Sequence, residues 1–433
     1  MPDVRPFRPL RYDSAVAGDL SQLIAPPYDV LDEPQQAALR QRSPFNIVHL
    51  DCGKGGPDYD RTRYAEAGRL FRQWQARGAL RQEERPSFFL CRHQFVAESG
   101  PAGGARFRRE LYAAVRVEPW SAQAVLPHEN TRSSARGDRV RLLDACDAVL
   151  SPVLGVYEDA SGALAHALER VEQEPPETTA TLDGEAMDLW ALPADLNGLA
   201  AGCLGAGPIV VADGHHRYEA GVAYAEAHCG SGCRGDEAAH FTLIALVEAS
   251  DPGLLILPYY RSLRRLGTER LEQLRTLLDA CYEALPFGGT LTELTASLAA
   301  SAPPRPLALA SAEGLTLLRP RGFDLAERLP DDHSLAWRSL EVSQAQELVL
   351  RPLLGCSAEE AERQGFLSYT SDVAEAVAAV HRGEAEAVLL LPPTTMAQVR
   401  AVARDGERVP PKSTYFHPKA PAGLLMMSLE GSL

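Results

Sequence analysis

The chain has 433 residues, of which 45% are hydrophobic and 23% are charged, and its formal net charge is −15. This length and composition predict a globular protein with two or three domains and a large core. The negative charge argues against a general DNA or RNA binder, because non-specific affinity for nucleic acids comes from neutralising their phosphates. A local basic pocket is still compatible with this negative net charge.

Membrane insertion and secretion are not expected from the sequence. No stretch approaches 18 uninterrupted apolar residues, and the opening MPDVRPFRPLRYDS lacks the apolar region of a signal peptide. The cysteines mostly stand singly in apolar segments, which is typical of buried thiols in a reducing compartment. We therefore expect a cytoplasmic protein with no membrane partner.

The N-terminal third alternates extended and helical patterns. LIAPPYDVLDE (23–33) predicts a rigid loop, and its Asp32 is a suitable cap for a following helix. The expected elements are a helix over 34–41, a strand over 43–51, an amphipathic helix over 58–80, and a hairpin of strands over 86–97 and 107–118.

The rest of the chain continues to mix the two element types. A polar loop from residue 119 becomes helical near Asp138. Further elements are strands over 151–159, 240–249, 253–263 and 384–393, helices over 163–173, 267–284, 341–354 and 394–406, and a strand pair after the Pro-rich break at 301–306. This pattern predicts an α+β or mixed α/β fold. We expect an N-terminal α/β region over 1–120, a core over 121–265 and a C-terminal α/β lobe over 266–433.

The segment VVADGHHRYEA (210–220) joins a buried strand to a helix through the turn Asp213-Gly214. His215, His216 and Arg217 fall in the first helical turn, where backbone N–H groups are unpaired and the helix dipole is positive. Cations are unfavourable at this position unless an anion completes the site. The pattern therefore predicts a phosphate site at the start of the helix.

Each residue of this turn has a functional and a structural interpretation. Asp213 is either a turn or capping residue or a catalytic or metal-linked carboxylate, and Gly214 is required by the backbone. His215 and His216 point about 100° apart, so one packs while the other donates to phosphate. Arg217 is expected to bind phosphate bidentately rather than to be a solvated surface charge.

His128 and Glu129 form a second candidate pair, in a polar loop that apolar burial does not explain. Glu129 is a candidate general base that would accept the proton of a hydroxyl during phosphoryl transfer, with His128 orienting it. An ordinary polar loop is the alternative. Asp138 is a plausible cap of the next helix, and Arg139 is a plausible second anion ligand.

The chain contains three lysines, and two of them stand in KSTYFHPK (412–419). This clustering indicates that position 412 or 419 needs a compact ammonium group, which arginine does not mimic. Lys412, Ser413 and Thr414 form either a phosphate-binding loop or a structural loop over the core, and the segment is not a P-loop. Tyr28 and Asp29 stand in a rigid polar loop suited to a site wall.

His228, Cys229, Cys233 and His240 resemble a metal site only superficially. Their spacing fits no common zinc pattern, and the residues between the cysteines are glycine and serine. We predict neither zinc nor a disulfide there.

Five motifs together resemble a known family. They are APPYDV (25–30), LPHENT (126–131), VADGHHRYEA (211–220), ILPYYR (256–261) and PPKSTYFHPK (410–419). In this order they are similar to the bacterial and archaeal family called domain of unknown function 1015, over nearly the whole chain. A more distant resemblance is to the ParB/sulfiredoxin-like fold, in which a similar turn holds nucleotide phosphates and whose free-serine kinases carry a DGHHR segment. The resemblance implies a ParB/sulfiredoxin-like core with an additional lobe. The substrate does not carry over, because this chain is longer.

Three functions are compatible with these residues. The favoured one is an ATP- or ADP-dependent phosphotransferase with Mg²⁺, acting on a small hydroxylated metabolite. A metal-dependent hydrolase built on Asp213, His215, His216 and His128 is less favoured, because adjacent histidines diverge on a helix whereas paired helical ligands stand four residues apart. The third is a nucleotide-sensing module without catalysis. The oligomeric state stays open.

Overall fold

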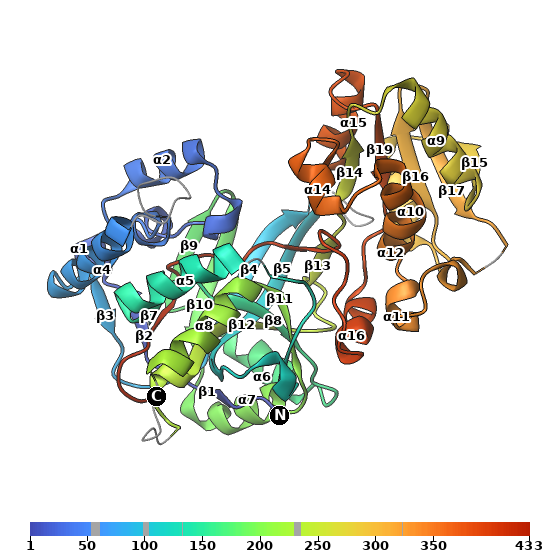
Figure 1. Ribbon diagram of the computed structural model, residues 1–433. Helices are drawn as coiled ribbons and strands as arrows, with labels where there is room; N and C mark the ends of the chain where they lie inside the picture. The colour runs from blue at the N-terminus through green and yellow to red at the C-terminus, as the bar shows by residue number, and fades with distance from the viewer. Residues whose placement is uncertain (53–60, 98–103, 132, 229–234, 323) are drawn as a thin grey trace. The chain divides into compact units, whose positions relative to one another are not determined.

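The computed structural model describes the chain except for residues 53–60, 98–103, 132, 229–234 and 323. The described chain divides into two units (Figure 1). Unit 1 comprises Met1–Phe95, Arg106–Leu254 and Pro418–Leu433, and unit 2 comprises Val96–Ala105 and Leu255–His417. Both units combine helices with mixed sheets, so the predicted mixed α/β fold class is confirmed.

The centre of unit 1 is a sheet that has nine strands in the described residues, in the order β6-β11-β8-β12-β5-β4-β10-β9 with β1 beside β5. Strand β11 runs parallel to β6 and antiparallel to β8. Leucine and β-branched residues make these central strands almost wholly buried, as expected of a sheet covered on both faces. The strands are β1 (Val4–Arg5), β4 (Phe89–Ala97), β5 (Gly104–Arg116), β6 (Val125–Pro127), β8 (Val153–Tyr157), β9 (Thr178–Leu182), β10 (Glu185–Ala191), β11 (Ile209–Asp213) and β12 (Phe241–Glu248).

Helices α4, α5 and α8 of unit 1 lie side by side (Figure 1). Gly68 of α4 permits a close approach to α5, since a Cβ atom there would lie 2.1 Å from the Ala145 carbonyl oxygen. A small sheet, β3-β2-β21-β7, packs with them. The helices are α1 (Ser14–Ala17), α2 (Glu33–Arg42), α3 (Val48–Asp51), α4 (Arg61–Ala76), α5 (Ser133–Cys146), α6 (Ala163–Val171), α7 (Asn197–Leu204) and α8 (His215–His228), and the small sheet has β2 (Pro9–Tyr12), β3 (Leu80–Gln82), β7 (Ala148–Val149) and β21 (Met426–Ser428).

Unit 2 has its own sheet, in the order β15-β17-β16-β19-β14-β18, and a separate pair, β13 with β20. Alternate residues of β19 point into two apolar cores, one on each face of the sheet. The strands are β13 (Leu255–Leu257), β14 (Tyr260–Leu263), β15 (Tyr282–Pro286), β16 (Leu307–Ser311), β17 (Gly314–Pro320), β18 (Leu367–Thr370), β19 (Ala387–Leu390) and β20 (Tyr415–His417). The helices are α9 (Gly267–Asp279), α10 (Leu291–Ala300), α11 (Leu335–Arg338), α12 (Glu341–Ala345), a π-helical turn (Gln346–Leu350), α13 (Arg351–Leu354), α14 (Ala358–Arg363), α15 (Val373–His381) and α16 (Met396–Arg404).

Several predicted elements are confirmed, including the helix that Asp32 caps through a capping box and the helix within 58–80. The strand predicted over 43–51 is wrong, since residues 48–51 form α3. The Asn46 side chain explains this helix start: its oxygen accepts from the Val48 N–H at 3.0 Å, and its amide donates to the Gln22 carbonyl at 2.8 Å. The segment 253–263 forms two strands in different sheets rather than one.

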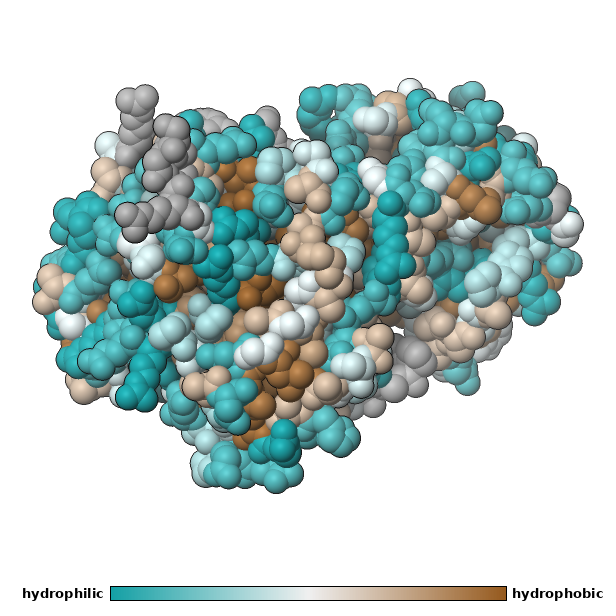
Figure 2. Space-filling model, turned by 90° about the horizontal axis from the view of Figure 1, so that it is seen from below, coloured by the Kyte–Doolittle hydropathy of each residue, from teal (hydrophilic) through white to brown (hydrophobic). Residues whose placement is uncertain are grey.

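The face drawn in Figure 2 shows hydrophilic and apolar residues interspersed. In the part of the chain that the structure describes, the large hydrophobic side chains that are exposed are those of Met1, Val16, Val30, Val96, Phe107 and Leu335. Among the same residues, no helix is both long enough and apolar enough to cross a bilayer.

A buried polar network ties three neighbouring strands of the unit 1 sheet together. The His93 ring contacts Glu110 at 3.1 Å and Glu185 at 2.8 Å, and Glu110 also accepts from Arg108 at 3.0 Å. Burial alone would lower the pKa of His93, but the two carboxylates outweigh burial and raise it. Burial would raise the pKa of Glu110, yet Arg108 and His93 lower it to about 2.

We predict that His93→Asn destabilises unit 1 more at pH 6 than at pH 9. Because the folded pKa of His93 is raised above the usual 6.5, its stabilisation is complete below pH 6.5 and is lost as the pH rises through the folded value. The loss should be about 1.4 kcal/mol for each unit by which the folded pKa exceeds the unfolded one. Urea unfolding of wild type and variant at both pH values measures it.

Tryptophan fluorescence in a Trp337→Phe background reports on unit 1, because the other tryptophans, Trp74, Trp120 and Trp190, belong to it. His166→Asn is the matched control, since the His166 side chain is 90% exposed. Equal destabilisation by His93→Asn at pH 6 and pH 9 would contradict the prediction.

Candidate functional site

The predicted strand–turn–helix is confirmed: β11 ends at Asp213 and α8 begins at His215. Gly214 joins them with φ +84°, a conformation that favours glycine. A Cβ atom at this position would lie 2.8 Å from Arg217 Nε, so the glycine also makes room for the Arg217 guanidinium. The turn thus depends on Gly214 for both backbone and packing.

The guanidinium of Arg217 lies back against the turn and is 7% exposed. It donates to Asp213 Oδ2 at 2.5 Å, to Ser151 Oγ at 2.9 Å, and to the Pro152 carbonyl. Its Nε–H has no hydrogen-bond partner among the described residues. Arg217 is therefore anchored by protein groups, with one donor left over.

Lys419 supplies a second cation to the same carboxylate. Its ammonium group contacts Asp213 Oδ1, and both side chains are 14% exposed. Burial would raise the pKa of Asp213, but the charges of Lys419 and Arg217 outweigh burial and hold it well below its usual value. The neighbouring Pro418 carbonyl accepts from Arg108 at 2.8 Å, which fixes this part of the chain. Of the two lysines for which a compact ammonium was expected, Lys419 is therefore the one that lies at the turn.

His128 and His215 contact each other directly, with ring centroids 4.7 Å apart. The His128 backbone N–H donates to His215 Nε2 at 3.2 Å, so that nitrogen carries no proton. His128 Nδ1 lies 2.5 Å from the Val211 carbonyl and must be the donor, and burial lowers the pKa of His128. The His215 ring therefore packs against His128, and His216 is half-buried. A phosphate contact by one of these two histidines stays a prediction.

Glu129 follows His128 and is half-buried. The contact between His128 and His215 brings this loop to the start of α8, and Thr131 of the same loop donates to Glu219 of α8 at 2.8 Å. Its role as a base stays a prediction.

Arg139 is buried and internally neutralised. It donates to Asp51 Oδ1 at 2.6 Å and to Asp138 Oδ2 at 2.7 Å, and its guanidinium stacks 3.6 Å above the Tyr28 ring. Asp138 is not a helix cap, because α5 begins at Ser133, before it. Asp138 instead accepts from Arg139, from Arg63 at 2.5 Å and from Tyr64 at 2.7 Å.

Asp29 interacts electrostatically with the charged groups of the turn, whereas the sequence predicted it only as part of a site wall. Desolvation and the negative charge of Asp213 raise the pKa of Asp29, although Arg217 and Lys419 act in the opposite direction. The residue keeps an exposed surface. Arg217 and Lys419 thus act on both Asp29 and Asp213, but the pKa of Asp29 is raised and that of Asp213 is lowered.

Lys412, Ser413 and Thr414 belong to unit 2. The Ser413 hydroxyl contacts the Pro410 carbonyl at 2.5 Å, and the Ser413 carbonyl accepts from Thr394 at 3.3 Å. The Lys412 ammonium lies 5.0 Å from the centre of the Tyr259 ring. In unit 2 this segment has the contacts of a structural loop, and its phosphate-binding role stays a prediction.

The atoms that a metal site would need are already engaged by protein groups. Asp213 holds two cations and His215 Nε2 accepts from the backbone. Within the described residues, no three His, Cys, Asp or Glu side chains gather in an arrangement that could hold a metal ion. Cys229 and Cys233, for which we predict neither zinc nor a disulfide, lie outside the described residues.

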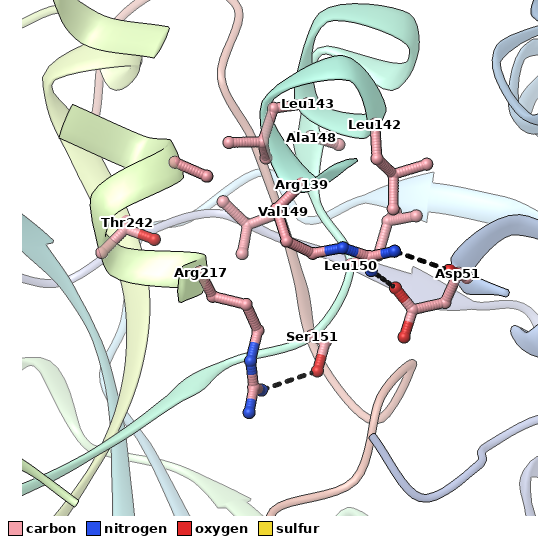
Figure 3. A pocket seen from close by; sticks show the side chains of 11 residues that line it. Asp51, Arg139, Leu142, Leu143, Ala148, Val149, Leu150, Ser151, Arg217 and Thr242 are labelled. Atoms are coloured by element: carbon pink, nitrogen blue, oxygen red, sulfur yellow. Dashed lines mark hydrogen bonds and ion pairs between the residues drawn. The ribbon is translucent and has the colours of Figure 1, made fainter. Parts of the chain in front are cut away.

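A pocket lies between α5 and α8, next to the Asp213-Gly214 turn (Figure 3). Arg217, Arg139, Asp51 and Ser151 line its polar end, and leucine, valine and alanine side chains together with Thr242 line the remainder. The dashed contacts in Figure 3 join Arg139 to Asp51 and Arg217 to Ser151. The turn thus opens beside a cavity that is polar at one end and apolar at the other.

Comparison with known proteins gives one family match. A family model described as "Protein of unknown function (DUF1015)" matches residues 4–375. No curated protein matches the chain by sequence.

Several solved structures are distantly similar. A conserved hypothetical protein from Pyrococcus furiosus has 13% identity and a TM-score of 0.34, over 72% of this chain and 93% of that one. A free serine kinase in complex with AMP has 13% identity and a TM-score of 0.36, over 73% and 92%. SbnI with C-terminal truncation from Staphylococcus aureus has 12% identity and a TM-score of 0.36, over 74% and 87%.

We predict that Gly214→Ala destabilises unit 1 more than Gly162→Ala does. Both glycines have positive φ, +84° and +65°, but a Cβ atom meets Arg217 at position 214 and nothing within 4 Å at position 162. The left-handed backbone costs each variant roughly 1 kcal/mol or more, and the clash with Arg217 adds to the cost only at position 214. Urea unfolding of both variants gives the comparison, and equal losses would show that Gly214 serves the backbone alone.

Proposed function

The chain belongs to the family described as "Protein of unknown function (DUF1015)", as its motifs predict, and we propose that unit 1 is an ATP- or ADP-dependent phosphotransferase acting on a small hydroxylated metabolite. The observation that carries this proposal is a pair of cations, Arg217 and Lys419, gathered on the buried carboxylate of Asp213 at the start of α8. Two positive charges and one negative charge leave this corner of the site suited to an anion.

The helix start strengthens the attraction for phosphate. Backbone N–H groups of the first turn of α8 lack intrahelical partners, and the helix dipole is positive there. His215 Nε2 accepts from the His128 backbone N–H, so this nitrogen does not donate to a phosphate. Gly214 makes room for the Arg217 guanidinium beside the helix start, where backbone N–H groups can bind phosphate oxygens.

The two carboxylates of the site suit different tasks. Asp213 is held ionised by Lys419 and Arg217, and it serves to position those cations. Asp29, whose pKa is raised by desolvation and by the charge of Asp213, is one candidate to receive the proton of an acceptor hydroxyl. Glu129 is the other candidate base, because its loop contacts the same helix start.

Mg²⁺ would accompany the nucleotide phosphates and shield their charge during transfer. It usually takes one or two carboxylates in addition to phosphate oxygens. Asp29 and Asp213 are the carboxylates of this site that could contact it, although Asp213 already holds two cations.

Arg217→Ala should weaken binding of ATP and ADP by roughly ten- to a hundredfold, as expected for the loss of a charged hydrogen-bond donor. Calorimetry with each nucleotide, with and without Mg²⁺, measures the affinities. Arg109→Ala is the matched control, because Arg109 forms an ion pair with Glu172 elsewhere in unit 1. Unchanged affinity in Arg217→Ala would exclude the turn as the phosphate site.

Asp29→Asn and Glu129→Gln separate the two candidate bases. Each preserves the shape of the side chain and removes its basicity, so the variant lacking the true base should lose turnover by roughly 10²–10⁴-fold while keeping its nucleotide affinity. Phosphorus NMR of ATP or ADP incubated with a panel of hydroxylated metabolites follows the transfer. Nucleotide binding without transfer to any member of the panel would favour the sensing module instead.

A further inference from the structure

The pocket between α5 and α8 contains two polar groups that the protein itself does not satisfy. Asp51 is 2% exposed; its Oδ1 accepts from Arg139 at 2.6 Å, whereas its Oδ2 has no partner among the described residues. Of the residues that line the pocket, Arg217 is the second with such an atom, its Nε–H. Buried polar atoms are nearly always hydrogen-bonded in folded proteins, so an unsatisfied acceptor and an unsatisfied donor in one pocket indicate a ligand.

We infer that this pocket receives the base of the nucleotide, and that Asp51 selects a base carrying an exocyclic amino group. The inference rests on the proposed function, because the phosphates of the same nucleotide would occupy the neighbouring turn. An amino group would donate to Asp51 Oδ2, and a ring nitrogen or carbonyl would accept from Arg217 Nε–H. Adenine and cytosine both offer this combination of donor and acceptor.

The walls of the pocket favour a flat apolar ring over other occupants. Leu142 and Leu143 belong to α5, Ala220 belongs to α8, and Val149 belongs to the short strand β7 (Figure 3). These side chains surround about 360 Å³ of space, solvent at the mouth included. A small hydroxylated acceptor would find few polar partners along these walls, whereas a heterocyclic ring would bury its faces there.

The carboxylate of Asp51 also excludes a phosphate group from the pocket. Its unpaired oxygen would repel an anion at short range in a buried position. Asp51 and Asp138 pair with Arg139, and Asp138 also pairs with Arg63, so these four charges balance one another. The unpaired oxygen of Asp51 and the apolar walls therefore favour the base over the phosphates in this pocket.

Two nucleotide pairs test the inference in the wild-type protein. ITP differs from ATP in having an oxo group in place of the 6-amino group and a proton on the adjacent ring nitrogen, and UTP differs from CTP in the same way at position 4 and its adjacent nitrogen. We expect the amino-bearing member of at least one pair to bind about tenfold or more tightly, because its partner would direct a carbonyl oxygen at Asp51. Calorimetry with all four nucleotides gives the ratios.

Asp51→Asn should reverse this preference. Arg139 donates to one side-chain oxygen of Asp51, so asparagine would keep its carbonyl toward Arg139 and direct its amide N–H₂ into the pocket. The amide would then favour the oxo base of the pair. Asp138→Asn is the matched control, because Asp138 also binds Arg139 but does not line the pocket.

The outcomes separate this inference from the proposed function. Equal affinities within both wild-type pairs would overturn the inference while the phosphate site stands, and so would a preference unchanged by Asp51→Asn. If Asp51→Asn fails to fold, the wild-type ratios still decide. Failure of all four nucleotides to bind wild type would overturn the proposed function and the inference with it.

Discussion

The candidate site depends on one buried carboxylate. Asp213 holds Arg217 from the following helix and Lys419 from a segment about two hundred residues later in the chain. Either cation alone would be unfavourable at the positive end of α8, and burying a cation without a counter-ion is costly. With Asp213 between them, both can lie at the helix start and still present donors outward. The remainder of the site is arranged around this ion cluster.

Four further hydrogen bonds keep the cluster in position. Ser151 and the Pro152 carbonyl fix the Arg217 guanidinium, Arg108 fixes the chain before Lys419, and His128 fixes the side chain of His215. Each of these partners is buried or comes from a strand or loop packed against the main sheet. A cluster held from several directions in this way is preorganised.

The strand, the Asp-Gly turn and the helix could be predicted from the sequence, because their signals are local: an apolar run, a turn pair and helical periodicity. Lys419 could be noticed in the sequence only because lysine is rare in this chain. The neighbouring residues do not indicate which distant carboxylate it contacts. Asp51 gave no such signal, and Asp29 was expected only as part of a site wall. The strand expected over 43–51 failed because the side-chain hydrogen bonds of Asn46 replaced backbone pairing. Asp138 failed as a cap because α5 begins at Ser133, before it.

The division of unit 1 along the chain has a consequence for its synthesis. Residues 418–433 belong to unit 1, but they follow 255–417, which form nearly all of unit 2. Strand β21 completes the small sheet beside β2 and β7, and Lys419 completes the ion cluster, only after the ribosome has made the whole of the intervening unit. A nascent chain that has already emerged through Leu254 therefore carries Asp213 and Arg217 without their second cation, and the ion cluster forms only when residues 418–433 have been made.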